Sequence, residues 1–228
     1  MFELLQQPSF LLGRSDDIHA LAHKPSARLL VLSDSHGMAQ NVRAIITHFG
    51  AECDALCFCG DGVRDLLATT ASLLGNAETA ACIPPVIALA QGNGDNASYA
   101  VQWRGTVSAM GAPKTQELVA AGNLIFVTHG HWYDVYYGTK ELFHAAKREK
   151  ARVALFGHTH IPYAAQEDGI LLLNPGSCAR PRRGAPQSCA VVTVSEHGAS
   201  YQFYALEEDG VTFTAYTPPK EEMSLLWQ

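Results

Sequence analysis

The sequence predicts an α/β fold in which two sheets pack on each other, flanked by helices, within one domain. Hydrophobic residues make up 47% of the 228 residues and charged residues 17%, which is typical of a compact globular protein and not of a disordered chain or a coiled coil. Apolar strand-like runs alternate with helical periodicity up to residue 90, and a series of short strand-like runs follows. No stretch is rich enough in Pro, Gly or Ser to divide the chain.

The N-terminal segment has a weak, polar pattern. We expect residues 1–27 to form a peripheral extension and residues 28–228 to form a single domain. Within the extension, Ser15 is expected to cap a short helix through Asp16–Ala22. The first residues carry no early basic side chain and lack the layout of a secretory signal. No apolar run approaches the ~18 residues needed to cross a bilayer, so we expect a cytoplasmic protein without membrane contact.

The first half of the domain shows alternating strands and helices, with strands that are apolar on both faces. The predicted elements are a strand at Leu29–Leu32, a helix at Met38–Phe49, a strand at Ala55–Cys59, a helix at Val63–Leu74 and a strand at Val86–Ala90.

After Asn96 the strand candidates become shorter and are separated by Gly, Pro and charged turns. A turn at 121–123 is expected to join two of them. The predicted strands are Ser98–Trp103, Thr115–Val119, Leu124–Thr128, Val153–Phe156, Tyr163–Gln166, Ile170–Leu173, Ala190–Val194, Tyr201–Ala205 and Val211–Thr214, with one helix at Thr139–Lys150.

Charge and cysteine usage exclude two classes of protein. The formal net charge of −6 argues against a surface that coats nucleic acid, so no long nucleic acid is expected as a partner. The six cysteines lack C-x2-C spacing, and three of them crowd one strand-like segment, which favours free, mostly buried thiols over a disulfide framework.

Five short motifs that can supply metal ligands each follow an apolar strand. In an open α/β sheet the carboxyl ends of strands form a common rim where ligands collect, so we expect the motifs to converge on one site. The motifs are Asp34-Ser35-His36, Gly60-Asp61, Gly92-Asn93-Gly94-Asp95, His129-Gly130-His131 and Gly157-His158-Thr159-His160.

The composition of these motifs predicts the chemistry. Carboxylate, amide and imidazole ligands together favour Mn, Fe or Zn over a thiolate-bound structural zinc. At least seven ligands are too many for one ion with open positions, whereas two ions about 3.5–4 Å apart would use them if one carboxylate bridged. Asp61 is the predicted bridge. Such a pair holds a water as hydroxide for in-line attack on a phosphoryl group, so the sequence predicts phosphoester hydrolysis.

The ordered motifs resemble those of the calcineurin-like metallophosphoesterase superfamily, and in particular its small, single-domain phosphodiesterase branch, in which Asn174-Pro175-Gly176-Ser177 also has a counterpart. The resemblance covers Leu29 to about Val194. It implies a four-layer α/β/β/α sandwich of two mixed sheets and two divalent ions, with Mn as the first expectation and Zn, Fe, Co or Ni as alternatives. It also implies one ion bound by Asp34, His36 and His160, another bound by Asn93, His129 and His158, and Asp61 between them.

One position departs from the superfamily pattern. Relatives usually have His where this chain has Gly94, and that His helps to stabilise the transition state and to protonate the leaving group. His131 is the candidate substitute, and its alternative interpretation is a histidine bonded to a backbone carbonyl beside the site. Asp95 is expected to orient a ligand or His131. The predicted catalytic residues are therefore His131, Asp95 and Asp61.

Two classes of function remain. The first is a hydrolase of small phosphodiesters such as cyclic nucleotides or nucleotide-like esters, whose expected partner is the small phosphoester substrate. The second is a non-catalytic protein-interaction scaffold on the same fold, similar to the retromer subunit that has lost part of the ligand set. The complete ligand set favours the hydrolase, and homo-oligomerisation is left open. Arg180, Arg182 and Arg183 either contact phosphate oxygens or form a solvated basic loop.

Overall fold

The computed structural model describes residues 2–103 and 105–219 and contains two large mixed sheets. The seven-stranded sheet has, in spatial order, β1 (Leu12–Gly13), β4 (Val86–Leu89), β3 (Ala55–Phe58), β2 (Ser26–Leu32), β12 (Ser188–Ser195), β13 (Gly198–Leu206) and β14 (Phe213–Tyr216). The five-stranded sheet has β10 (Pro162–Glu167), β11 (Ile170–Pro175), β9 (Val153–Leu155), β8 (Asn123–Thr128) and β7 (Thr115–Ala120). Within them, β2, β3 and β4 run parallel, as do β8, β9 and β11.

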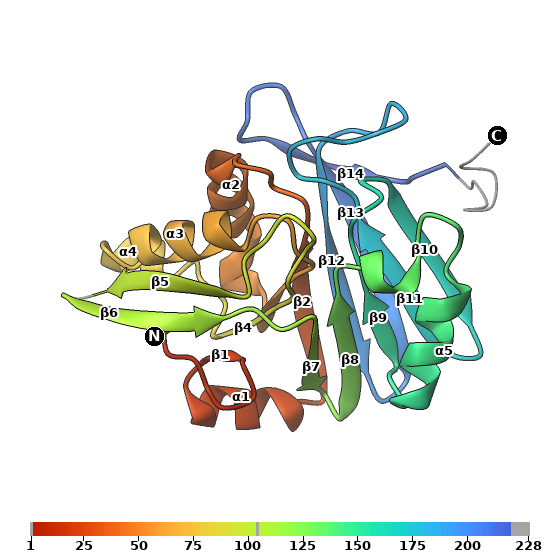
Figure 1. Ribbon diagram of the computed structural model, residues 1–228, viewed down its shortest axis with the longest axis horizontal. Coiled ribbons are helices and arrows are strands. Elements are labelled where there is room, and N and C mark those ends of the chain that lie inside the picture. Colours follow the sequence, from red (N-terminus) through yellow and green to blue (C-terminus); the bar gives the residue numbers. More distant parts are fainter. Residues whose placement is uncertain (1, 104, 220–228) are drawn as a thin grey trace.

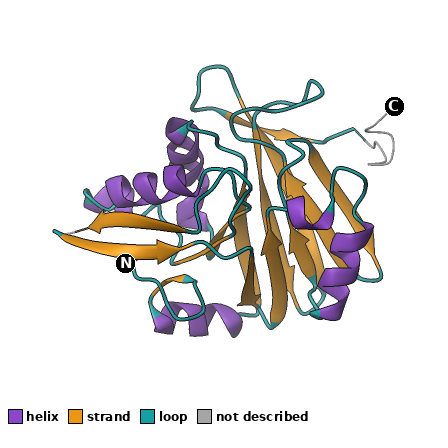
Figure 2. Ribbon diagram, in the orientation of Figure 1, coloured by secondary structure: helices purple, strands orange, loops and turns teal. Residues whose placement is uncertain are grey.

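The layers are helix, sheet, sheet and helix (Figure 1). Helices α2 (Ala39–Phe49) and α3 (Val63–Leu73) share one buried cluster with one face of the seven-stranded sheet. Helix α5 (Lys140–Arg148) shares another with the outer face of the five-stranded sheet. Figure 2 shows these helices on the outside and the strands between them. The predicted four-layer α/β/β/α fold is confirmed.

Side chains of β2 show how the sequence produces this layering. Leu30 and Leu32 pack with the helices α2 and α3, whereas Leu29 and Val31 pack in the cluster between the two sheets. All four side chains are fully buried. Because successive strand residues point to opposite faces, a strand covered on both sides needs an uninterrupted apolar run.

The predicted elements are present, with ends shifted by at most three residues, as between Leu29 and Ser26 at the start of β2. The turn between β7 and β8 is also as expected. Ala120 pairs with Asn123, and the two residues between them have φ of 49° and 72°, as in a type I′ hairpin.

The N-terminal segment was expected to be peripheral, and this is wrong for its apolar residues. β1 pairs with β4 and forms the edge strand of the seven-stranded sheet, and Leu12 is fully buried. Helix α1 (Ser15–Ala22) places Leu21 in the cluster between the sheets. Ser15 is the first residue of α1, and its hydroxyl donates to Gln7 Oε1 over 3.1 Å instead of capping the helix.

Two segments that looked like loops in the sequence have regular structure. β5 (Ser98–Trp103) pairs with β6 (Thr106–Gly111) in a separate hairpin, and a short helix α4 (Ala77–Ala80) begins at Asn76, whose side chain accepts from Glu78 N. Most of β6 is exposed, so it lacks the apolar alternation by which a strand is recognised. Within the described ranges, no helix has the length and apolarity required to cross a bilayer.

Candidate metal centre

All seven predicted ligand residues lie together where parallel strands of both sheets end. Two contacts across the sheets show this convergence. The backbone N–H of His158, after β9, donates to Asp34 Oδ2, after β2, over 3.0 Å. His129, after β8, places Nδ1 2.7 Å from the carbonyl of Cys59, after β3. The rim that collects the ligands is therefore built from two sheets instead of one.

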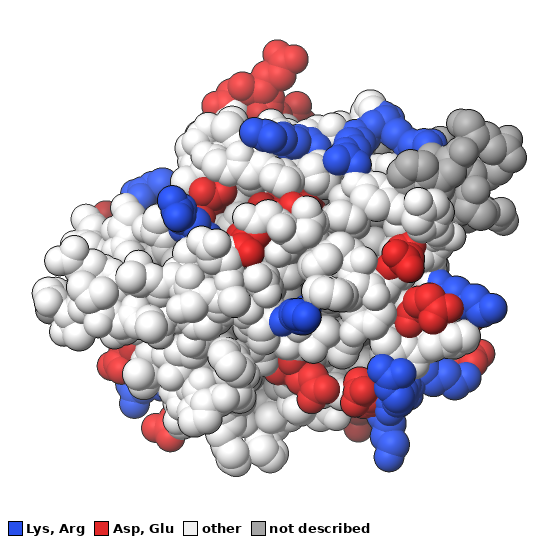
Figure 3. Space-filling model, viewed as in Figure 1, with Lys and Arg blue, Asp and Glu red and all other residues white. Residues whose placement is uncertain are grey.

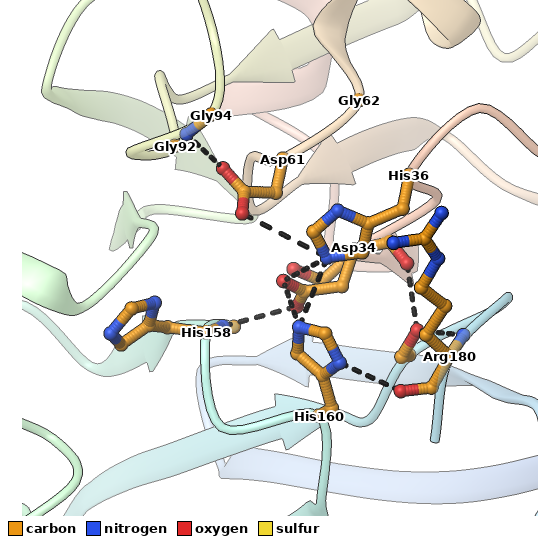
Figure 4. Close-up of polar contacts among 12 residues, drawn as sticks. Asp34, His36, Asp61, Gly62, Gly92, Gly94, His158, His160 and Arg180 are labelled. Atoms are coloured by element: carbon orange, nitrogen blue, oxygen red, sulfur yellow. Dashed lines mark hydrogen bonds and ion pairs between the residues drawn. The ribbon is translucent and has the colours of Figure 1, made fainter. Parts of the chain in front are cut away.

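The first ligand group consists of Asp34, His36 and His160 (Figure 4). Asp34 Oδ1 lies 3.2 Å from His160 Nε2 and 3.7 Å from His36 Nε2, and these two ring nitrogens are 3.0 Å apart. Asp34 is fully buried, yet its Oδ1 accepts no hydrogen bond from any of the described residues. A buried carboxylate oxygen without a partner is costly, so this donor set fits a cation between the three side chains.

The second group lies on the other side of Asp61. Asp61 Oδ2 is 3.8 Å from His36 Nε2 in the first group and 3.6 Å from His129 Nε2 in the second. His129 Nε2 is also 3.2 Å from Asn93 Oδ1 and 3.2 Å from His158 Nδ1. Asp61 thus lies between the groups, and Asp34 Oδ1 approaches His129 Nε2 to 4.0 Å.

Backbone carbonyls determine which ring nitrogen faces the site in two histidines. His129 Nδ1 lies 2.7 Å from Cys59 O, and His160 Nδ1 lies 2.7 Å from Arg180 O. Because a carbonyl only accepts, each Nδ1 carries the proton and each Nε2 presents a lone pair to the cluster. This arrangement is the usual way in which a protein orients a metal-binding imidazole.

The ligand residues have an unusual backbone conformation. Left-handed φ values are found at five of them, namely Asp34 (57°), His36 (41°), Asp61 (54°), His158 (70°) and His160 (62°). Non-glycine residues rarely adopt this region, and such conformations cluster at functional sites where the surrounding structure holds them. The sharp turns direct side chains from strand ends into the common rim.

Glycines permit the close approach of these turns. A Cβ added at Gly157 would lie 2.0 Å from Ser33 Oγ and 2.7 Å from Asp34 Oδ2. At Gly92 it would lie 2.1 Å from Asp61 Oδ1. The motif glycines are therefore required by space beside the two carboxylates.

The pKa shifts of Asp34 and His158 suit metal ligation. Burial alone would raise the pKa of the Asp34 carboxyl, but the neighbouring imidazoles of His160 and His36 outweigh burial and hold this pKa well below its usual range. Burial, together with the neighbouring His129, lowers the pKa of His158 to about 4. An ionised carboxylate and a neutral imidazole are the forms that bind a metal ion.

Asp95 orients the ligand loops through their backbone N–H groups, and none of its hydrogen bonds within the described ranges reaches His131. Its Oδ2 accepts from the N–H groups of Asp61 (2.7 Å) and Gly92 (3.0 Å). Its Oδ1 accepts from the N–H groups of Gly62 and Val63, at the start of α3, and from the Tyr99 hydroxyl. A carboxylate that is saturated by donors in this way is a positioning group, which agrees with the expectation that Asp95 orients a ligand.

Asp95→Asn is expected to lower the free energy of unfolding by about 2–3 kcal/mol, because its amide nitrogen would face backbone N–H donors. Urea denaturation of the metal-free protein measures the change. Tyr99→Phe is the matched control, since it removes only one of the five donors. An Asp95→Asn protein as stable as Tyr99→Phe would show that the carboxylate does not hold these loops.

His131 lies beside the cluster. Its ring centroid is 5.3 Å from that of His129 and 5.9 Å from that of His158. Its buried Nδ1 has no hydrogen-bond partner in the described part of the chain, which disagrees with the alternative of a histidine fixed by a backbone carbonyl. Burial, together with the neighbouring His129, lowers the pKa of His131.

Several further polar residues support the ligand loops through hydrogen bonds that the sequence did not show. Asp65 Oδ2 accepts from Ser35 Oγ and Gly37 N, which braces the loop after β2. In the Asn-Pro-Gly-Ser motif, Asn174 donates to Gly157 O and Ser177 donates to Asp34 O, over 2.8 Å and 2.7 Å. Their position next to ligand motifs was the available signal, but their partners lie far away in sequence.

A cavity of about 420 Å³ opens over the cluster. This volume lies within the range of small-molecule sites. Five of the predicted ligand residues line the cavity, namely His36, Asp61, Asn93, His158 and His160. The rest of the lining consists of Tyr136 and of the loop residues Arg180, Pro181 and Arg182.

Comparisons with known proteins agree with this geometry. The sequence model of the calcineurin-like phosphoesterase superfamily domain matches residues 28–197. A protein of Bacillus subtilis named probable metallophosphoesterase YsnB is 30% identical over 177 residues, which cover 77% of this chain and 89% of that protein. The crystal structure of a predicted phosphoesterase from Streptococcus pneumoniae matches with 25% sequence identity and a TM-score of 0.61, and the match covers 85% of this chain and 99% of that one. Vacuolar protein sorting 29 from Cryptosporidium parvum shares the fold, with a TM-score of 0.63 at 15% identity, covering 85% and 97% of the two chains.

Proposed function

The chain belongs to the calcineurin-like phosphoesterase superfamily, and we propose that it is a hydrolase of small phosphoesters that uses two divalent metal ions. The observation that carries this proposal is the buried, unpartnered Asp34 Oδ1, which faces His36 and His160. Asp61 lies between this group and His129. Such a donor set is satisfied by cations and is difficult to explain as a purely structural cluster.

Each ion has its own set of side chains in this proposal. Asp61 would contact both ions, with Mn as the first expectation and Zn, Fe, Co or Ni as alternatives. One ion would be held by Asp34, His36 and His160, and the other by Asn93, His129 and His158. Bound ions supply an activated water and positive charge that stabilises the phosphoryl oxygens during in-line displacement.

The chain's own residues would orient the reaction. Asp95 holds the backbone of Asp61 in position, and Gly94 N donates to Asp61 Oδ1 over 2.7 Å. His131, beside the cluster, is the candidate for giving a proton to the leaving group.

A protein-interaction scaffold is the second candidate function. The structural likeness to vacuolar protein sorting 29 is at 15% identity and therefore concerns the fold alone. The intact ligand set of this chain favours the hydrolase, because a scaffold has no need of a buried carboxylate that lacks a partner.

The proposal predicts a higher kcat/KM for a phosphodiester than for a matched monoester, because a monoester dianion brings extra charge that needs cationic contacts at the scissile phosphoryl group. Elemental analysis should show two bound ions in the Mn-loaded protein. Kinetics on bis(4-nitrophenyl) phosphate and 4-nitrophenyl phosphate test the preference. Two ions without turnover of either ester would favour the scaffold, and faster turnover of the monoester would reverse the substrate class.

A further inference from the structure

Arg182 lines the catalytic cavity and is held there by two contacts. One is made directly with the ligand loop after β9, and the other reaches that loop through Tyr136. The backbone N–H of Arg182 donates to the carbonyl of the ligand residue His160 over 3.2 Å. Its guanidinium donates through Nη1 to the Tyr136 hydroxyl and lies 5.6 Å from the centroid of the Tyr136 ring. The position of this cation is therefore tied to the metal centre.

Tyr136 connects Arg182 to a second ligand residue. Its hydroxyl donates to the carbonyl of His158 over 2.8 Å, and its ring packs edge-on against the His158 imidazole at a centroid distance of 4.5 Å. A hydroxyl can donate one hydrogen bond and accept others, so both contacts of the Tyr136 oxygen form together. Tyr136 thus links the guanidinium to the backbone of the ligand residue His158.

Two arginines, Arg180 and Arg182, line the cavity although the chain as a whole is acidic. Figure 3 shows basic side chains along the upper edge of the molecule, where the loop between β11 and β12 lies in Figure 1. Arg180 lies in the same loop and lines the cavity together with His36 (Figure 4). Among the carboxylates of the described residues, none lies within ion-pair distance of Arg182. The guanidinium fork can therefore receive an anion from solution.

We propose that Arg182, positioned by Tyr136, binds an anionic group on an ester arm of the substrate. The substrate class is then a phosphodiester that carries a second phosphate beyond the scissile phosphoryl group. The planar guanidinium suits bidentate binding of phosphate, and the cavity of about 420 Å³ has room for more than one phosphoryl group. This inference rests on the proposed function of the same site.

Two esters with the same leaving group test the proposal. The 4-nitrophenyl ester of thymidine 5′-phosphate has an uncharged nucleoside arm, and the same ester of thymidine 3′,5′-bisphosphate adds one phosphate to that arm. Wild-type Mn-loaded protein should have a kcat/KM about tenfold higher for the second ester, as expected for one charge-assisted contact at a solvent-accessible rim.

Arg182→Gln should remove this preference, and Arg182→Lys should retain only part of it because a single ammonium lacks the fork. Tyr136→Phe should also lower the ratio, since the guanidinium loses its hydroxyl partner; elemental analysis must show that this variant retains its metal. Arg183→Gln is the matched control, because Arg183 is the next arginine of the loop and does not line the catalytic cavity. Its ratio should remain that of wild type.

Binding provides a readout that is independent of turnover. In calorimetric titrations, Arg182→Gln should weaken thymidine 3′,5′-bisphosphate about tenfold more than thymidine 5′-phosphate. Equal ratios in wild type and Arg182→Gln, with both esters hydrolysed, would overturn this inference while leaving the proposed function intact. Absence of turnover of both esters by the metal-loaded protein would remove the proposed function and this inference with it.

Discussion

Replacing Asp61 with asparagine is expected to weaken metal binding in both ligand groups and to lower kcat/KM on a 4-nitrophenyl diester by more than about a hundredfold. Asp61 Oδ2 lies within 4 Å of an imidazole nitrogen of each group, at 3.8 Å from His36 and 3.6 Å from His129. Loss of a residue that only supports a ligand already costs roughly 10–100-fold in metal affinity or activity, so loss of a shared ligand should cost more.

The contact of the second carboxylate oxygen makes asparagine a severe change despite its similar shape. Gly94 N donates to Asp61 Oδ1 over 2.7 Å (Figure 4). An asparagine would keep its carbonyl oxygen toward that donor, because the amide nitrogen cannot accept. Its NH2 group would then face the imidazoles, where a metal ion requires a lone pair. The substitution also removes one negative charge from a site that must hold two cations.

Elemental analysis, together with metal titration of the apo protein, measures this effect. Asp16→Asn is the matched control, because the Asp16 side chain is 89% exposed and far removed from any ligand motif in the sequence. Urea denaturation of the metal-free variants must show that both remain folded. Two ions bound to Asp61→Asn as tightly as to wild type would remove Asp61 from the shared position.

The sequence predicted which residues gather at the site because each of them directly follows an apolar run that predicts a strand. Five apolar runs predicted strands, and the polar residues directly after them were correctly expected to converge. The sequence did not show that the rim is made by two sheets, with Asp34 and Asp61 on one and His129 and His158 on the other. Periodicity reports local structure, whereas the pairing of distant strands depends on packing between them.

The residues that the sequence missed are those with distant partners. Leu12 ends a short apolar run, Phe10-Leu11-Leu12, in a segment of weak pattern, yet it pairs with Ile87 at the sheet edge. Tyr136 follows no strand and belongs to no motif, and its role becomes visible only through its contacts with His158 and Arg182. The sequence indicated that Asp95 orients a ligand or His131, but not that it would do so by accepting from the backbone N–H groups of Asp61 and Gly62.

Gly94→His is expected to accelerate hydrolysis of a diester with an alkoxide leaving group, such as a 2′,3′-cyclic nucleotide, by about a hundredfold. A positioned general acid contributes ~10²–10⁴ in rate when the departing oxygen is basic. The backbone of Gly94 is compatible with the change, since its φ is outside the positive region that favours glycine and an added Cβ would meet Asp61 Oδ1 at 3.2 Å. That contact is tight and places the new side chain directly beside the carboxylate between the two ligand groups.

The leaving group distinguishes proton donation from other effects of the substitution. A 4-nitrophenolate departs without a proton, so Gly94→His should change the hydrolysis of a nitrophenyl diester little. Gly94→Gln is the matched control, because it places the same Cβ near Asp61 and brings no titratable proton. Elemental analysis must precede the kinetics, since an imidazole beside Asp61 could bind a metal ion itself. If the correctly metallated Gly94→His protein changes both substrates by the same factor, leaving-group protonation does not depend on position 94, and His131 becomes the residue to replace next.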